Sequence, residues 1–183
     1  MSYNITVKEG NLLSEPEATF IVNSTNTKLL LSHGVSMAFK LHCGIKLQKE
    51  MLARIKNLQF ALKKGDVVAT SPCDASNFKY ALHAVIVEFS RDIEDKEKLP
   101  TIKTVYDALK NIESYMIWHS KEKKEQKIKL VLPLMGCGLS GLNKGSIIGL
   151  YKSFFLREVF FDCEVVIYGY TREDYDMINE ILI

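Results

Sequence analysis

Strand-like and helix-like segments alternate along this chain of 183 residues. The predicted strands are short apolar runs rich in β-branched residues, at 3–8, 18–23, 67–72, 80–87, 128–134 and 164–168. The predicted helices place apolar residues three and four apart, at 33–43, 45–58, from 100–101 onward, 144–160 and 172–182. Several strands are apolar on both faces, which requires helices on both sides of the sheet. The sequence therefore predicts an α/β fold, a three-layer α/β/α sandwich.

The composition favours one compact domain that spans residues 1–183. Hydrophobic residues make up 47% of the chain, and no Pro-, Gly- or Ser-rich linker divides it. The 24 basic and 22 acidic side chains give a net charge of +2. Such a balance provides no strong attraction to nucleic acid. An anion-binding site in this chain must therefore be local.

The sequence carries no secretory signal and no apolar stretch near the ~20 residues that span a bilayer. We therefore expect a cytoplasmic monomer without a membrane segment. The cysteines are scattered without a C-x-x-C pair, which argues against a zinc ribbon or a redox motif. They are Cys43, Cys73, Cys137 and Cys163. We expect reduced, mostly buried thiols, no metal site and no cofactor.

The segment 136–141, G-C-G-L-S-G, matches the dinucleotide-binding pattern G-x-G-x-x-G. A Rossmann domain would place these glycines after its first strand, with an acidic residue about 20 positions later. Here they follow the penultimate predicted strand, and the next strand ends at Tyr168-Gly-Tyr without an acid. The remaining interpretations are a loop whose backbone N–H groups close on a phosphate, or a tight turn without a ligand.

A second polar loop follows the predicted strand at 18–23. Asn23 and Asn26 stand where this strand ends, and Gly34-Val-Ser begins the next helix. Asparagine supplies a donor and an acceptor, and a helix N-terminus attracts phosphate. Two such loops at strand carboxyl ends predict a diphosphate cleft at the carboxyl edge of the sheet.

Together these segments resemble the macrodomain family of ADP-ribose-binding α/β/α domains. Residues 22–37, V-N-S-T-N-T-K-L-L-L-S-H-G-V-S-M, are similar to the family's V-N-A-A-N-x-x-L loop and G-G-G-V helix start. Residues 65–85 are similar to its G-x-x-x-x-T … Y-x-x-H-x-V segment, and 133–141, P-L-M-G-C-G-L-S-G, to its second loop. Gly10-Asn-Leu takes the position of its G-D-(I/L). The likeness covers nearly the whole chain and implies a central mixed sheet.

The resemblance also implies a role for each candidate residue. Asn11 and the backbone of Leu12 would meet the adenine amino edge, and Tyr170 would stack on adenine. Asn26, beside Asn23, would face the distal ribose. The phosphates would lie on backbone groups of Gly34, Val35 and Ser36 and of Gly136, Cys137, Gly138 and Leu139, with Ser140 beside the distal ribose. The implied partner is ADP-ribose or an ADP-ribosylated protein or nucleotide.

Departures from the family pattern bear on catalysis. Asn11 replaces the first-motif aspartate, and Ser32-His33-Gly34 replaces the glycine triad. Ser36 and Ser140 stand where two hydrolase branches have a catalytic aspartate. Hydrolysis would then need a water oriented by Asn26, the ligand phosphate and His33. A binder is therefore favoured over a hydrolase of ADP-ribose esters or glycosidic bonds.

Three further alternatives follow from single features. Lysines 121, 123 and 124 beside an adenine pocket would suit single-stranded RNA or oligoadenylate, which the near-neutral charge and the absence of interleaved aromatic residues disfavour. His83, in an apolar strand, is predicted to be a hydrogen-bonded core or cleft-wall residue and not a general base. Cys137 is predicted to pack and not to act as a nucleophile.

Overall fold

The computed structural model describes residues 2–89, 98–123 and 127–183. Its strands form one six-stranded sheet in the order β1-β6-β5-β2-β4-β3. They are β1 (Tyr3–Glu9), β2 (Ala18–Asn26), β3 (Val67–Thr70), β4 (Phe78–Val87), β5 (Lys127–Pro133) and β6 (Asp162–Gly169). Neighbouring strands are parallel except β3, which pairs antiparallel with β4. The predicted mixed sheet is therefore confirmed.

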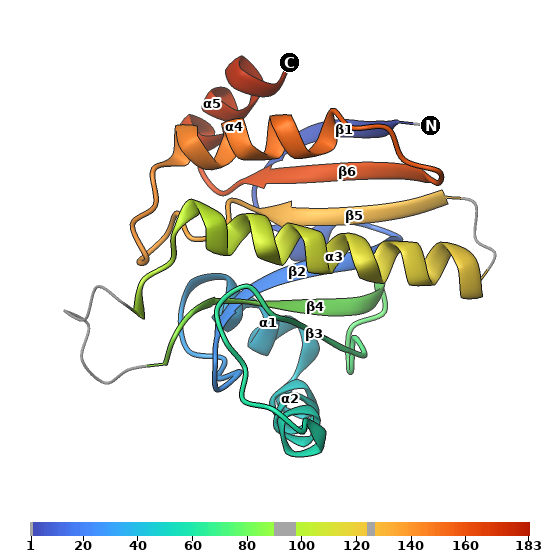
Figure 1. Cartoon of the computed structure of the whole chain (residues 1–183), viewed down its shortest axis with the longest axis vertical. Helices are drawn as coiled ribbons and strands as arrows, with labels where there is room; N and C mark the ends of the chain where they lie inside the picture. The colour runs from blue at the N-terminus through green and yellow to red at the C-terminus, as the bar shows by residue number, and fades with distance from the viewer. Residues whose placement is uncertain (1, 90–97, 124–126) are drawn as a thin grey trace.

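Helices cover both faces of this sheet (Figure 1). The helices are α1 (Gly34–Cys43), α2 (Ile45–Asn57), α3 (Ile102–Glu122), α4 (Lys144–Phe155) and α5 (Arg172–Leu182), with a short 3-10 helix η1 (Leu12–Ser14). One hydrophobic cluster packs α3, α4 and α5 against the sheet, and a second packs η1, α1 and α2 against the opposite face. The predicted three-layer α/β/α architecture is confirmed.

The predicted α3 has its expected start and its expected core face. Thr101 caps the helix by accepting a hydrogen bond from the backbone N–H of Thr104, and the Thr104 side chain accepts one from the Thr101 backbone N–H. The predicted apolar stripe of α3 is completely or almost completely buried. It consists of Val105, Leu109, Ile112 and Met116. Parts of the charged segments expected beside α3, at 90–97 and 124–126, lie outside the described residues.

Two element boundaries differ from the sequence prediction in ways that matter. Strand β2 continues to Asn26, with a register shift against β4 between Thr25 and Asn26. Helix α4 ends at Phe155, five residues before its predicted end. The chain turns there because Arg157 Nε donates to the Phe154 carbonyl at 2.8 Å and the buried Phe161 packs edge-to-face on Tyr3. The prediction that α4 reaches residue 160 is wrong.

The five parallel strands all end at the same edge of the sheet, on the left in Figure 1. This edge carries the loops that follow β1, β2, β5 and β6. Within the described ranges, no helix is long and apolar enough to cross a bilayer.

Candidate functional site

The strand order brings the predicted site segments together. Along the sheet, β1 is followed by β6, β5 and β2. Their following segments therefore succeed one another at its carboxyl edge: Asn11, Tyr170, the 136–141 loop and the Asn26 loop, which comprises residues 26–33. The first two segments are joined directly, because Gly10 N–H donates to the Gly169 carbonyl at 2.9 Å. Residues far apart in the sequence therefore share one edge because parallel strands end there.

The 136–141 loop is a tight turn that leaves backbone donors exposed. Gly136 has φ +77°, and a Cβ placed on it would lie 2.6 Å from Leu142 Cδ1, so this position requires glycine. The turn is closed by a 2.9 Å bond from Leu142 N–H to the Gly136 carbonyl. The backbone N–H groups of Gly138, Leu139 and Ser140 have no acceptor in the part of the chain that the structure describes. These three donors are available to an anion.

Gly138 itself is open to its surroundings. It lies in an exposed stretch, and a Cβ placed on it meets no atom within 4 Å. Helix α4, which follows the loop, is different, because the Asn143 side chain accepts from Ser146 N–H at 2.9 Å and caps it. The donors of the second loop therefore come from the turn and not from the first turn of α4.

Helix α1 begins at the same edge without a side-chain cap. His33 is its N-cap residue and has extended backbone angles, but its side chain accepts no bond from the helix. By contrast, Thr101, Asn143 and Thr171 cap α3, α4 and α5. The first N–H groups of an α-helix lack internal partners and carry the positive end of its dipole. The first turn, Gly34 to Ser36, thus supplies a second group of backbone donors without a side-chain cap.

A chain of buried hydrogen bonds anchors this first turn. The Ser36 hydroxyl donates to Asn23 Oδ1 at 3.0 Å and lies 2.9 Å from the Ser24 carbonyl. The Asn23 amide group donates to His83 Nδ1 at 3.0 Å. His83 Nε2 then donates to the Thr70 hydroxyl at 2.8 Å. The chain links α1 to β2, β4 and β3 through completely buried Asn23 and His83.

His83 is uncharged in this arrangement. Burial lowers its pKa from 6.5 to about 3, against a weaker opposing effect of Glu50. Because the amide nitrogen of Asn23 can only donate, the Nδ1 atom of His83 accepts and the proton resides on Nε2. The predicted role of His83 as a hydrogen-bonded core residue is confirmed. Asn23, predicted to contact ligand, lies beneath the site and contacts Ser36.

Asn26 organises its own loop. Its Oδ1 accepts from the backbone N–H groups of Lys28 and Leu30 at 3.0 and 3.3 Å, and its amide donates to the Leu30 carbonyl at 3.1 Å. The side chain is 9% exposed. His33 is exposed at the start of α1. These two residues were predicted to orient a water. The His33 side chain is accessible to solvent, whereas the side-chain amide of Asn26 is largely engaged in hydrogen bonds within its own loop.

The adenine side of the predicted site is more exposed. Tyr170 is 82% exposed, as expected for a ring that can stack on a base. Asn11 is also exposed, and its Oδ1 accepts from Leu13 N–H at 3.0 Å as the cap of η1. Leu12 is buried. In the second loop, Leu139 is 88% exposed and Ser140 is half-buried.

A buried carboxylate holds η1, and sequence analysis missed it. Glu15 is 1% exposed and accepts from Lys8, Lys129 and the Tyr168 hydroxyl. Burial favours the protonated carboxyl, but the hydrogen bonds outweigh it and lower the pKa of Glu15. Burial and the hydrogen bond to Glu15 raise the pKa of Tyr168 to about 12. No local pattern marks Glu15, because its partners come from three different strands.

A second pair, also missed, joins α4 to α5. Lys144 Nζ donates to Asp174 Oδ1 at 2.5 Å. Burial opposes ionisation of Asp174, yet the bonds from Lys144 and Thr171 lower its pKa overall. The T-x-x-D spelling of Thr171 and Asp174 could have indicated the capping box, but not the lysine. Beside this pair, burial raises the pKa of Cys137 to about 11, which favours packing over nucleophilic chemistry.

Metal ligands are not gathered at this edge. Among the described residues, no group of three His, Cys, Asp or Glu side chains is placed to hold a metal ion. All four cysteines are free, with Cys43 and Cys163 buried and the other two partly exposed. The candidate residues at this edge offer backbone N–H groups, amides, hydroxyls, an imidazole and an exposed tyrosine, and the ion pairs Lys144–Asp174 and Arg172–Glu9 lie beside them.

Comparison with solved structures shows the same fold in other macrodomains. A macrodomain of Oceanobacillus iheyensis with MES bound is 19% identical with a TM-score of 0.78, over 97% of this chain and 89% of that chain. A mutant of the same macrodomain with ADPR is 20% identical with a TM-score of 0.77, over 97% of this chain and 91% of that chain. A Trypanosoma brucei macrodomain in complex with ADP-ribose is 16% identical with a TM-score of 0.74, over 98% of this chain and 69% of that chain.

Comparisons of the sequence itself give two results. No curated protein matches it. The family model of the Macro domain matches residues 22–148, a range that includes the Asn26 loop, α1 and the 136–141 loop. The predicted resemblance to this family is thereby confirmed, and the chain belongs to the macro domain family.

Proposed function

We propose that this chain binds ADP-ribose, or an ADP-ribosyl group on a protein or nucleotide, at the carboxyl edge of its sheet. The main support for this proposal is two groups of backbone N–H donors on the loops that follow the neighbouring strands β2 and β5. One is the first turn of α1, which has no side-chain cap, and the other is the run of N–H groups from Gly138 to Ser140, which have no acceptor among the described residues. A diphosphate presents acceptor oxygens to both groups at once.

The rest of the edge suits the two ends of the ligand. Tyr170 offers an exposed ring beside the cap of η1, which matches the adenine end. The Asn26 loop and Ser140 follow β2 and β5, farther along the sheet from Asn11, and in this proposal they face the distal ribose. The solved O. iheyensis and T. brucei macrodomains named above include complexes with ADPR and ADP-ribose, which supports this assignment of the ligand class.

Binding without hydrolysis is the favoured form of this function. The two serines at the family's aspartate positions provide no carboxylate, and Ser36 is buried with its hydroxyl engaged by Asn23 and Ser24. Hydrolysis would depend on the exposed His33 and the ligand's own phosphate. Binding of single-stranded RNA is a weaker alternative. Tyr170 after β6 and Phe89 after β4 are exposed at the described edge, but β5 and β2 separate them, so these two rings do not form a continuous stacking platform.

Calorimetry with ADP-ribose tests the proposal. We expect saturable binding to one site, with an affinity that falls only modestly as salt is raised, because one diphosphate makes few ionic contacts. The absence of heat would refute the proposal. A steep fall in affinity with salt for an oligoadenylate probe, tighter than ADP-ribose, would favour the nucleic-acid alternative. Incubation with a mono-ADP-ribosylated protein then separates a reader from a hydrolase by release of ADP-ribose.

A further inference from the structure

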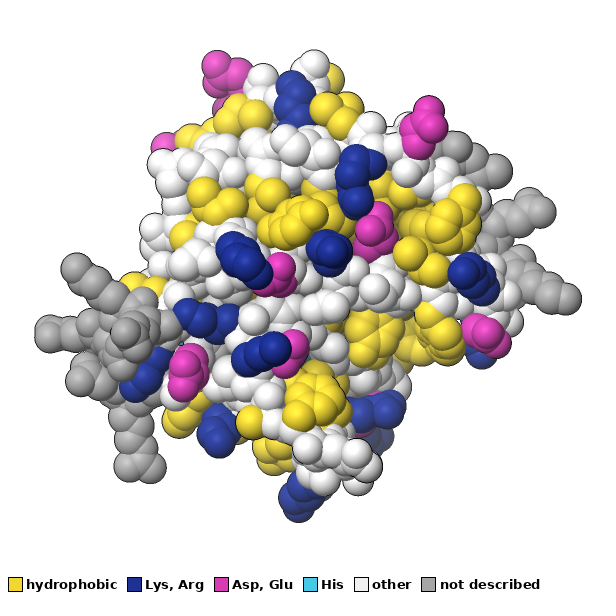
Figure 2. All heavy atoms as spheres, in the orientation of Figure 1, with side chains coloured by type: hydrophobic (Ala, Val, Ile, Leu, Met, Phe, Trp, Pro, Cys, Tyr) yellow, Lys and Arg dark blue, Asp and Glu magenta, His cyan; other side chains and the backbone are white. Residues whose placement is uncertain are grey.

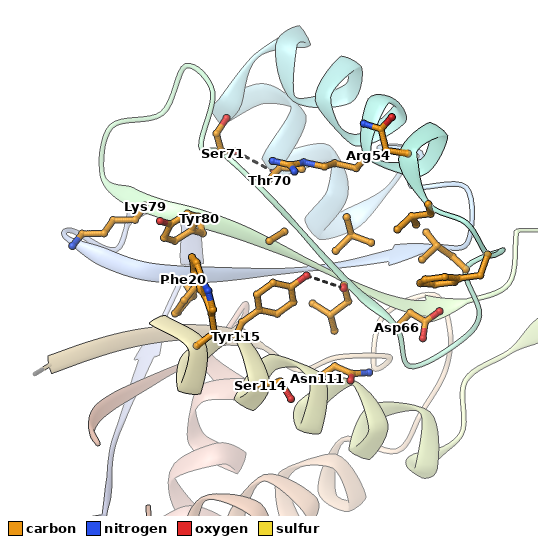
Figure 3. A pocket seen from close by; sticks show the side chains of 18 residues that line it. Phe20, Arg54, Asp66, Thr70, Ser71, Lys79, Tyr80, Asn111, Ser114 and Tyr115 are labelled. Atoms are coloured by element: carbon orange, nitrogen blue, oxygen red, sulfur yellow. Dashed lines mark hydrogen bonds between the residues drawn. The ribbon is translucent and has the colours of Figure 1, made fainter. Parts of the chain in front are cut away.

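A cavity of about 880 Å³ lies away from the candidate site, along the edge strand β3. Figure 3 shows it between α2 and α3, with Tyr115 reaching from α3 toward β3. Its apolar wall includes Phe20, Leu58, Phe60, Tyr80, Tyr115 and Trp118. Figure 2 shows hydrophobic side chains on the same face of the molecule. None of the residues that line this cavity belongs to the predicted ADP-ribose site.

The cavity extends around the free edge of β3. Val67 and Ala69 pack with the α3 side of the sheet, whereas Val68 packs with the α2 side. All three, together with Thr70, line the same cavity. Because successive side chains of a strand point to opposite faces, a space that reaches both sets can receive the alternating side chains of an added strand.

Tyr115 already occupies part of the place of such a strand. Its hydroxyl donates to the Val67 carbonyl at 3.3 Å, a long O–H···O distance, and accepts from the Ala69 backbone N–H. Burial raises the pKa of Tyr115, so this hydroxyl remains a donor at neutral pH. Covering an exposed strand edge with a side chain prevents unwanted pairing. Here a single hydroxyl, with one long bond, covers two backbone groups that an added strand would pair more completely.

The charged side chains that line the two ends of the groove have opposite signs, and one of them, Arg54, is also paired with Glu50 at 3.3 Å. Arg54 lies at the Thr70 end, because Glu50 Oε1 accepts both from Arg54 and from the Ser71 backbone N–H. Lys79 is near the same end, since Thr70 pairs with Ala81 in the sheet. Asp66 directly precedes β3 at the other end. A peptide with an acidic residue at one end and a basic residue at the other is complementary to this arrangement.

We propose that the groove binds an extended peptide segment of a partner protein as an additional strand beside β3. The peptide displaces the Tyr115 hydroxyl, pairs with Val67 and Ala69, and places an aromatic or large apolar residue against Tyr80 and Trp118. Strand addition derives affinity from main-chain hydrogen bonds and specificity from side-chain pockets. It also covers Phe60 and Trp118, which are 64% and 45% exposed. This function is independent of ADP-ribose binding.

The single tryptophan of the chain is a built-in reporter, because Trp118 lines the groove. The probes are two acetylated, amidated peptides of the same composition, Lys-Val-Phe-Val-Glu and Glu-Val-Phe-Val-Lys. We expect one of them to change Trp118 fluorescence saturably at concentrations up to ~1 mM. Its proline variant, with Pro in place of the central Phe, should bind at least about tenfold more weakly, because the change removes both a backbone donor and the ring that packs on Tyr80 and Trp118.

Tyr115→Phe is the decisive variant. It deletes the competing hydroxyl and keeps the ring, so we expect the preferred peptide to bind about fivefold more tightly. Arg54→Ala should weaken the same peptide and reduce the preference between the two. If the Tyr115 hydroxyl itself bound the ligand, as in a small-molecule pocket, the preferred peptide would bind Tyr115→Phe more weakly than the wild type. That result would overturn the proposal.

Two other outcomes would also overturn it. The first is no saturable fluorescence change with either peptide in the wild-type protein and in Tyr115→Phe. The second is concentration-dependent sedimentation that is abolished by Trp118→Ala, which would identify the occupant as a second copy of this chain. Calorimetry with ADP-ribose in the presence of the peptide keeps the tests separate, since the ADP-ribose affinity should not change.

Discussion

The Ser36 hydroxyl donates to Oδ1 of Asn23 at 3.0 Å, and Ser36 is 4% exposed, so a buried donor stands where the family resemblance implies an aspartate. A carboxylate in place of the Ser36 hydroxyl would be repelled by two acceptor oxygens, Asn23 Oδ1 and the Ser24 carbonyl. We expect Ser36→Asp to lower the free energy of unfolding by about 2 kcal/mol, and Ser36→Ala by about 1 kcal/mol. Urea denaturation at pH 7 measures both. A Ser36→Asp protein as stable as the wild type would show that the network can reverse its polarity.

His33→Asp separates stability from ligand binding. An aspartate at this N-cap can accept from the free N–H groups of the first turn of α1, so the free energy of unfolding should rise by about 1 kcal/mol. The same carboxylate occupies the donors and repels a phosphate, so affinity for ADP-ribose should fall about tenfold. His33→Ala is the control for loss of the imidazole alone. Tighter binding by the more stable variant would contradict the placement of a phosphate at α1.

Gly138→Glu tests the second donor group. A Cβ at this position meets no atom within 4 Å, and Gly138 does not have a positive φ, so the fold should be retained. The added carboxylate lies among the exposed N–H groups, and we expect calorimetry to detect no ADP-ribose binding. Gly138→Ala should retain most of the affinity, and Ser153→Glu controls for the same charge on an exposed face of α4. Unchanged affinity in Gly138→Glu would exclude this loop as a phosphate site.

The buried His83 predicts a pH dependence of stability. Its pKa is lowered in the folded protein to about 3, so the unfolded chain binds the extra proton below pH 6.5. Stability is therefore lost as the pH falls, by about 2 kcal/mol between pH 7 and pH 5. In this window the carboxylates, whose unfolded-state pKa values lie near 4, contribute little. His83→Gln should flatten the dependence measured by urea denaturation, and an equal slope in both proteins would contradict the assignment.

Tyr170 offers a test of the adenine end. Stacking of a base on an aromatic ring contributes about 1–3 kcal/mol, so Tyr170→Ala should weaken ADP-ribose binding roughly tenfold to a hundredfold. Tyr170→Phe keeps the ring and should bind nearly as well as the wild type. Because Tyr170 is 82% exposed, neither change should alter the melting temperature appreciably. Equal losses in both variants would point to the hydroxyl and not to stacking.

The periodicity of apolar residues was sufficient to predict the layers. The stripe of α3 and the bounds of α5 agree with the structure, because local spacing alone decides which face of a helix is buried. The end of α4 was not predictable in this way. The helix stops where Phe161 must turn back to pack on Tyr3 at the opposite end of the chain, and no local signal marks that contact.

The candidate site also combines features that the sequence predicts with features that it does not predict. The positions of the glycines and of Asn26 predicted two loops at strand carboxyl ends, and those loops share one edge in the structure. The burial of Asn23 and the bond between Glu15 and Tyr168 depend on which strands are neighbours. Polar side chains that look alike in the sequence therefore have different places in the structure. Some, such as His33, are exposed, and others, such as Asn23, are buried beneath the exposed ones.

The sequence by itself determined the α/β/α layers, the family and the two donor-bearing loops, because apolar periodicity and glycine conformation are local properties of the chain. Only the tertiary structure decided that Ser36 is tied to His83 through Asn23, and that Tyr115 covers the edge of β3. These contacts join residues many positions apart. They form only when the sheet order and the helix packing bring their partners within hydrogen-bonding distance.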